Sequence, residues 1–103
     1  MAVGCATTFK LLICAHNHTA DESAGWEITG LVSRPQTSGN VKLIGTPTGN
    51  TGPPTWGDTA PLSSWTAVVS ADTSNQYLKV TVTGEAAKTI TWIARMTTAE
   101  LAY

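Results

Sequence analysis

The last third of the chain, residues 65–101, alternates apolar and polar side chains in three consecutive stretches. A period of two residues is that of a β-strand, whose successive side chains point to opposite faces of a sheet. Two polar segments, residues 72–76 and 84–87, separate the stretches and are typical of tight turns. The residues expected to share the core face are Trp65, Ala67, Val69, Leu78, Val80, Val82, Ile90, Trp92, Ala94 and Met96. The pattern predicts three antiparallel β-strands.

Three further strands are predicted upstream, over residues 7–16, 26–34 and 41–45. In the first, one face carries Phe9, Leu11, Ile13 and Ala15, and in the second Trp26, Ile28 and Val32 are in register. Because Leu12 and Cys14 make the other face of the first strand apolar, we expect that strand to be covered on both sides. Gly30 interrupts the second strand and predicts a bulge or a close backbone approach.

Six short strands predict an all-β fold, an antiparallel β-sandwich of jelly-roll-like form. A length of 103 residues corresponds to one domain, residues 1–103. We expect Trp26, Trp65 and Trp92 to lie in the core, with residues 17–25 and 36–40 forming polar turns.

Charged residues make up 13% of the chain, against roughly 25% in ordinary soluble domains. A surface rich in threonine and poor in charge favours burial against copies of the same chain, so we expect a homo-oligomer. The net charge of −1 gives no basis for binding nucleic acid. The longest apolar runs fall short of the ~18 residues that cross a bilayer, so no membrane insertion is expected. The apolar run at residues 11–15 is also too short for a signal peptide.

No group of residues predicts catalysis. The seven carboxylates include no pair that the spacing selects, and no nucleophile motif is present. His16 and His18 are weak metal candidates, because residues two apart on a strand share a face, yet no third ligand is placed. The alternative is that they end a strand. Cys5 and Cys14 are expected to be free thiols, since two cysteines complete neither a disulfide framework nor a zinc site. We therefore expect a non-enzyme without cofactors.

The segment of residues 46–64 is rich in proline and glycine and lacks periodicity, and loops of this length are usually functional. Trp56 lies in its middle and offers a large surface for stacking on a sugar ring or anchoring an interface. Asn50, Thr55 and Asp58 are its predicted polar companions in a ligand site. The alternative is that Trp56 folds back and plugs the edge of the sandwich.

Several motifs of the chain occur in one order in a known family. The closing motif consists of Ala71-Asp72-Thr73, Asn75, Leu78–Val80, Thr81–Ala86, Lys88–Ile90 and Trp92–Arg95, and the upstream motifs are Asp21–Ile28, Gly30-Leu31 and Leu43–Thr48. Over residues 7–101 the chain resembles the β-rich C-terminal domain of tail-fibre and other virion proteins of tailed bacteriophages.

This resemblance implies a virion structural protein or fibre domain, assembled in the host bacterial cytoplasm. The role of such a protein would be assembly, with attachment to a host receptor or a capsid. The implied partners are two further copies in a trimer, other virion proteins and a host surface glycan. The competing hypothesis is a carbohydrate-binding module of another setting that uses Trp56.

Overall fold

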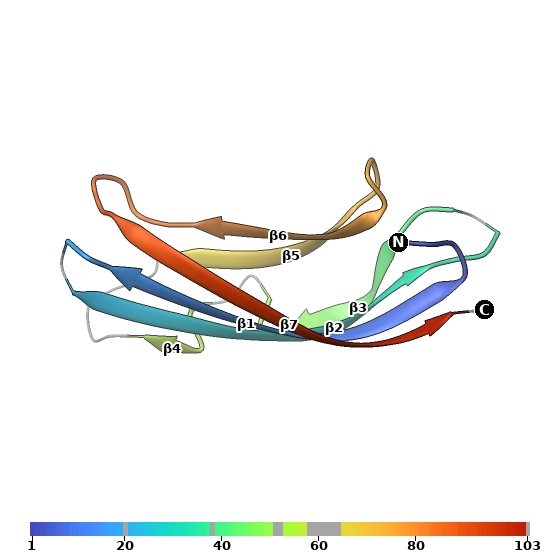
Figure 1. The fold of residues 1–103 in the computed structure, drawn as a ribbon, viewed down its shortest axis with the longest axis horizontal. Coiled ribbons are helices and arrows are strands. Elements are labelled where there is room, and N and C mark those ends of the chain that lie inside the picture. The colour runs from blue at the N-terminus through green and yellow to red at the C-terminus, as the bar shows by residue number, and fades with distance from the viewer. Residues whose placement is uncertain (20, 38, 51–52, 58–64, 103) are drawn as a thin grey trace.

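The computed structural model describes residues 1–19, 21–37, 39–50, 53–57 and 65–102, and these form β-strands and turns without a helix. The strands are β1 (Cys5–Asn17), β2 (Glu22–Arg34), β3 (Lys42–Thr48), β4 (Trp56–Gly57), β5 (Thr66–Asp72), β6 (Tyr77–Thr83) and β7 (Ile90–Ala102). The molecule is elongated, with extents of 49 × 22 × 19 Å (Figure 1). Nothing in the described ranges forms a helix that could cross a membrane.

The larger of two sheets has the strand order β3-β2-β1-β7, and the short β4 pairs with β2. Its pairs are all antiparallel. β1 pairs along its whole length with both neighbours, so that Ile13 lies opposite Trp26 of β2 and Ala94 of β7. The inner side chains of three long strands are thereby held in register.

The second sheet is the β5–β6 hairpin, which lies over the inner face of the larger sheet (Figure 1). Between the layers lies a single buried core made of Phe9, Leu11, Ile13, Ala15, Ala24, Trp26, Ile28, Val32, Val41, Trp65, Ala67 and Val69. The predicted antiparallel β-sandwich is confirmed. Its jelly-roll-like form is not confirmed. β3, β2 and β1 are neighbours in one sheet, β7 returns to pair with β1, and β5–β6 form a separate hairpin, whereas a jelly roll contains two Greek keys.

Three tryptophans connect the layers. Trp26 of β2 and Trp65, just before β5, have no exposed surface, as predicted for core residues. Trp92 of β7 is only partly buried and packs against this core. Its ring centroid lies 5.5 Å from that of Trp26, in a stacked arrangement, and 6.4 Å from that of Trp65. The indole of Trp92 therefore packs against the core without being enclosed by it.

The strand boundaries differ from the predicted ones in several places; at the end of the chain, β7 continues to Ala102 beyond the predicted end at Thr98. β2 begins at Glu22, because residues 22–25 continue the ladder with β1 through a stretch predicted to be a turn. β3 continues to Thr48, and the two residues of β4 form a strand, both inside the segment predicted to be irregular. Backbone pairing to a well-formed neighbour overrides the low strand propensity of these residues.

Gly30 has the role that the sequence predicted. The pairing of β2 with β3 shifts register between Thr29 and Leu31, as in a β-bulge. A Cβ at Gly30 would lie 2.9 Å from Cζ of Phe9 and 3.2 Å from Cβ of Pro47. The bulge is therefore also a place where the backbone approaches the core closely.

The sandwich is open where β6 and β7 meet solvent. These strands follow one another in the chain but belong to different sheets, so they form no ladder with each other. Val80 and Val82 of β6 lie opposite the buried Val69 and Ala67, yet they are 37% and 38% exposed. Met96 of β7 is 39% exposed. The predicted face points inward on these strands, but the prediction that Val80, Val82, Ala94 and Met96 lie in the core is wrong, because all four are exposed.

Candidate functional site: the outer face around Trp56

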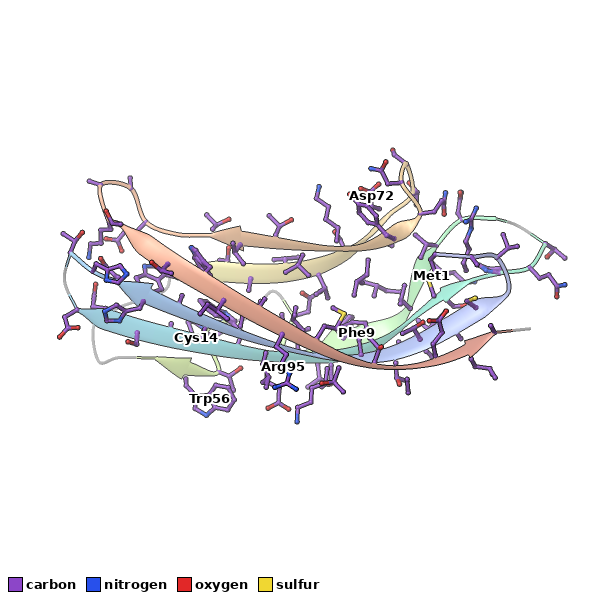
Figure 2. The ribbon with its side chains drawn as sticks, in the orientation of Figure 1. Met1, Phe9, Cys14, Trp56, Asp72 and Arg95 are labelled. Carbon is purple, nitrogen blue, oxygen red and sulfur yellow. The ribbon has the colours of Figure 1, made fainter. Side chains whose placement is uncertain are left out.

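Trp56 lies on the outer face of the larger sheet, which points away from the β5–β6 hairpin (Figure 2). It pairs with Gly25 of β2. Gly25 leaves the space that the indole occupies, because a Cβ there would lie 3.2 Å from Cε3 of Trp56. The residue is 56% exposed. Trp56 is therefore a surface side chain fixed on the sheet, and it does not plug the edge of the sandwich.

The predicted companions of Trp56 have different positions. The hydroxyl of Thr55 accepts a hydrogen bond of 3.0 Å from the backbone N–H of Glu27, which fixes the chain just before the indole. The amide of Asn50 is engaged with β5, accepting from the N–H of Val69 at 2.8 Å and donating to its carbonyl at 3.1 Å. Asp58 lies outside the described residues. Of the predicted set, only Thr55 is shown to support Trp56 directly.

The register of the sheet assembles other residues beside the indole. One row crosses four strands in register and consists of Trp56, Gly25, Cys14 and Ile93. The next row consists of Glu27, Leu12 and Arg95. Adjacent strands lie about 4.8 Å apart, so the first row spans three such steps. The indole of Trp56 lies at one end of the first row and Ile93 at the other, and of the two residues between them only Cys14 has a side chain.

Two hollows flank the indole of Trp56. One, of about 370 Å³, extends toward Ser23 and Gly57. The other, of about 330 Å³, extends across the sheet and is bounded by Leu12, Ile93 and Arg95. Both are also lined by Cys14, Gly25 and Trp56. The indole is therefore a wall between two neighbouring concave surfaces, and we call the second of these the Trp56–Arg95 groove.

Of the charged side chains beside this groove, Lys10 and Glu27 interact with each other, whereas Arg95 has no salt bridge to a described residue. Lys10 and Glu27 lie on the outer face, and their side chains are 3.7 Å apart. Arg95 is exposed and forms no salt bridge with any residue for which the structure gives a position. Since the Glu27 carboxylate already has a cationic neighbour, the groove has its uncompensated positive charge at Arg95.

Sequence reasoning missed Leu12, Ile93 and Arg95 as parts of a site. The available signal is the apolar residues on the parity opposite to the core, which for Leu12 and Cys14 favours the interpretation that both faces of the strand are covered. That interpretation is wrong: Leu12 is 42% exposed and Cys14 is exposed. Within the described part of the chain no element covers the outer face there, so the apolar parity marks a surface.

The two histidines are close together, as expected from their spacing. Their ring centroids are 4.9 Å apart, edge to face. His16 has its Nδ1 2.9 Å from the Ser23 hydroxyl, and its Nε2 lies 3.4 Å from a carboxylate oxygen of Asp21. Nε2 of His18 is 2.8 Å from the Thr91 hydroxyl. Within the described ranges, no three His, Cys, Asp or Glu side chains gather as a metal site.

A charged cluster ties the β6–β7 turn to the start of β2. Nζ of Lys88 lies 3.1 Å from carboxylate oxygens of both Glu22 and Glu85. Hydrogen bonds to these carboxylates raise the pKa of Lys88. Glu22 also accepts a hydrogen bond of 2.9 Å from the amide of the buried Asn17. Because each group here is held by an opposite charge or an amide, the cluster joins strands together.

The two thiols are both free but differ in environment. Cys5 is buried at the start of β1, and desolvation together with the neighbouring Glu100 raises its pKa. Cys14 is exposed in the floor of the Trp56–Arg95 groove. The expectation of free thiols is confirmed.

The chain was compared with known proteins at three levels. No protein-family model, curated protein or solved structure matches it.

Proposed function

We propose that this chain is a non-enzymatic structural domain of a tailed-bacteriophage virion, which assembles with copies of itself and serves attachment. The observation that carries the proposal is the open side of the sandwich. Val80, Val82 and Met96 lie on inner faces, where a complete sandwich buries its side chains, and each is more than a third exposed.

A second copy of the chain suits this open side. β7 ends the larger sheet and presents the backbone groups of a 13-residue strand along its free edge. Such an edge pairs readily with another strand unless it is covered. A closed ring of copies covers both the free edges and the half-exposed valines, with no surface left for further growth. The resemblance to fibre proteins adds the threefold order, the phage setting, the partner virion proteins and assembly in the bacterial cytoplasm.

Light scattering after size-exclusion chromatography tests the assembly. We expect three times the 10.8 kDa chain mass. Val82→Glu should shift the mass to that of the monomer, because it places a charge on the open inner face. Thr81→Glu is the matched control on the outer side of the same strand, where Thr81 is exposed, and it should leave the mass unchanged. A parent protein that stays monomeric at every concentration, or equal effects of the two variants, contradicts the proposal.

The second candidate function is a carbohydrate-binding module outside a phage. The exposed Trp56 above its two hollows favours binding of a sugar ring. The two settings are separated by electron microscopy of phage particles labelled with an antibody to this chain. Label at a fixed position on particles supports the virion domain, and particles without label support the module.

A further inference from the structure

The outer face of a sandwich that meets solvent is ordinarily polar, but around the Trp56–Arg95 groove it is apolar. Ile93 is 69% exposed and Leu12 is 42% exposed, and both lie beside the half-exposed indole. Single apolar side chains on a surface require no explanation, whereas a contiguous group around a hollow is typical of a binding site. This face lies on the opposite side of β7 from the inner-face residues of the assembly proposal.

The groove is largely formed before any ligand arrives. β4 holds the backbone of Trp56 against Gly25, and the Thr55 hydroxyl fastens the preceding residue to β2. Ile93 and Arg95 stand on β7, which pairs with β1 along its entire length. Side chains on rigid strands lose little conformational entropy when a ligand binds, which favours recognition of a small rigid partner.

The size and walls of the groove indicate a sugar ring. Its volume of about 330 Å³ falls at the small end of ligand sites, which are typically ~300–1,000 Å³. A tryptophan face stacks on the apolar C–H face of a pyranose, and the exposed indole of Trp56 is available for such a contact. A purely aliphatic ligand would use Leu12 and Ile93 but would leave the cation of Arg95 unmatched.

Arg95 determines the charge of the expected ligand. It lines the groove directly, opposite Leu12 in the β1–β7 ladder. A guanidinium binds a carboxylate through two parallel hydrogen bonds, which gives both affinity and orientation. Among the residues that the structure places, Glu27 lies in the same row of this face, across Leu12 from Arg95, and it interacts with Lys10. The position beside Arg95 is therefore complementary to an anion attached to the ring.

We infer that the Trp56–Arg95 groove binds a pyranose that carries a carboxylate, the common chemistry of hexuronic and sialic acids in surface polysaccharides. Trp56 stacks on the ring, Leu12 and Ile93 contact its apolar edge, and Arg95 binds the carboxylate. This inference rests on the attachment part of the proposed function and names the class of ligand.

Nuclear magnetic resonance titration tests the inference, with the Trp56 indole N–H signal as the reporter. The probes are methyl glucuronide and the methyl glycoside of N-acetylneuraminic acid, with methyl glucoside and glucose 6-phosphate as comparisons. We expect both carboxylated probes to bind more tightly than the neutral one, by about tenfold, and more tightly than the phosphate. Equal affinity for the acidic and neutral sugars, tighter binding of the phosphate, or no response to any probe overturns the inference.

Four variants assign the contacts. Arg95→Gln should reduce the affinity for the carboxylated probes to that for methyl glucoside, while Lys79→Gln removes a cation of β6 and should change nothing. Trp56→Ala should abolish binding of all four probes, followed through the remaining groove amides, and Tyr77→Ala is the control for loss of an exposed aromatic ring. Loss of binding in both control variants contradicts the assignment.

The same samples separate this inference from the assembly proposal. The oligomer mass is measured by light scattering before each titration. A trimer that binds none of the probes refutes the acidic-sugar site and leaves assembly standing. A monomer that binds the carboxylated probes refutes the assembly and leaves the site standing.

Discussion

At the scale of single residues, the four tryptophans show how position determines the role of one side-chain type. Trp26 and Trp65 are enclosed by the core, Trp92 is packed against it from one edge, and Trp56 stands on the outer face. All four occur in strands or at their starts, so the residue type alone does not distinguish them. What differs is the face of the sheet on which each indole lies and how much of its surface the other side chains cover.

The tryptophans predict a graded series of stabilities. Trp26→Ala should lower the free energy of unfolding by about 3–5 kcal/mol, the range for a buried aromatic side chain. Trp92→Ala should cost less, about 2–3 kcal/mol, because part of its surface is already exposed. Trp56→Ala should cost under about 1 kcal/mol, as for a surface substitution. Urea denaturation followed by circular dichroism measures all three. If Trp56→Ala proved the most damaging, the assignment of inner and outer faces would be wrong.

At the scale of elements, the β5–β6 hairpin is fixed by its turn. A carboxylate oxygen of Asp72 accepts hydrogen bonds from the N–H groups of Ser74 and Asn75, at 3.0 and 3.1 Å, and its other oxygen accepts one from the Asn75 amide. The turn is also anchored to the rest of the molecule, since the Gln76 side chain accepts from the N–H of Val41 at 2.7 Å. The hairpin is thereby positioned over the larger sheet at this end.

The Asp72 turn predicts an acid-sensitive contribution to stability. The hydrogen bond from the Asn75 side chain, followed by those from backbone N–H groups, lowers the pKa of Asp72 below its ordinary value of 3.8. A lowered pKa in the folded state means that the stabilisation is complete above the unfolded value and is lost as the pH falls through the folded value. The parent should therefore lose stability below about pH 4.

Asp72→Asn is the matched variant, because it keeps one acceptor oxygen at the turn but cannot titrate. Its stability in urea should fall less than that of the parent as the pH is lowered below about 4. At neutral pH the parent should be the more stable protein, since only a charged carboxylate accepts all three hydrogen bonds. Parallel pH profiles for the two proteins would show that this carboxylate is not the titrating group.

At the scale of the whole molecule, one continuous core joins the two sheets, and two thiols report separately on its interior and on the outer surface. Cys5 is 4% exposed where the start of β1 pairs with the ends of β2 and β7. Cys14 is exposed on the outer face of the same strand. The chain thus carries one thiol that reports on the folded surface and one that reports on the opening of the core.

Alkylation with iodoacetamide, followed by peptide mass spectrometry, should label Cys14 at the rate of an exposed thiol. Cys5 should react much more slowly in water, because it is buried and its raised pKa leaves less of the reactive thiolate. In urea, the labelling of Cys5 should follow the global unfolding transition, as expected for one cooperative domain. Labelling of Cys5 well before that transition would show that the end of the larger sheet opens independently.

The sequence by itself determined six of the seven described strands and the side chains that point inward from them. Alternation places Phe9, Leu11 and Ile13 on one side, and Gly30 marks its bulge, because these features depend on local backbone geometry and on the absence of a side chain. Residues 22–25 escaped prediction because their residue types favour turns, and their strand character comes from pairing with β1 across the short turn that precedes them.

Only the tertiary structure decided which apolar residues are covered. Val80 and Val82 follow the same alternation as Val69 but remain partly exposed, because coverage depends on how far the other layer extends. The groove likewise depends on strand order: Trp56 and Arg95 are far apart in the chain and meet on one face because β4 and β7 flank β2 and β1. Alternation fixes the direction of a side chain, whereas its neighbours across the sheet are fixed by long-range pairing, which no local pattern encodes.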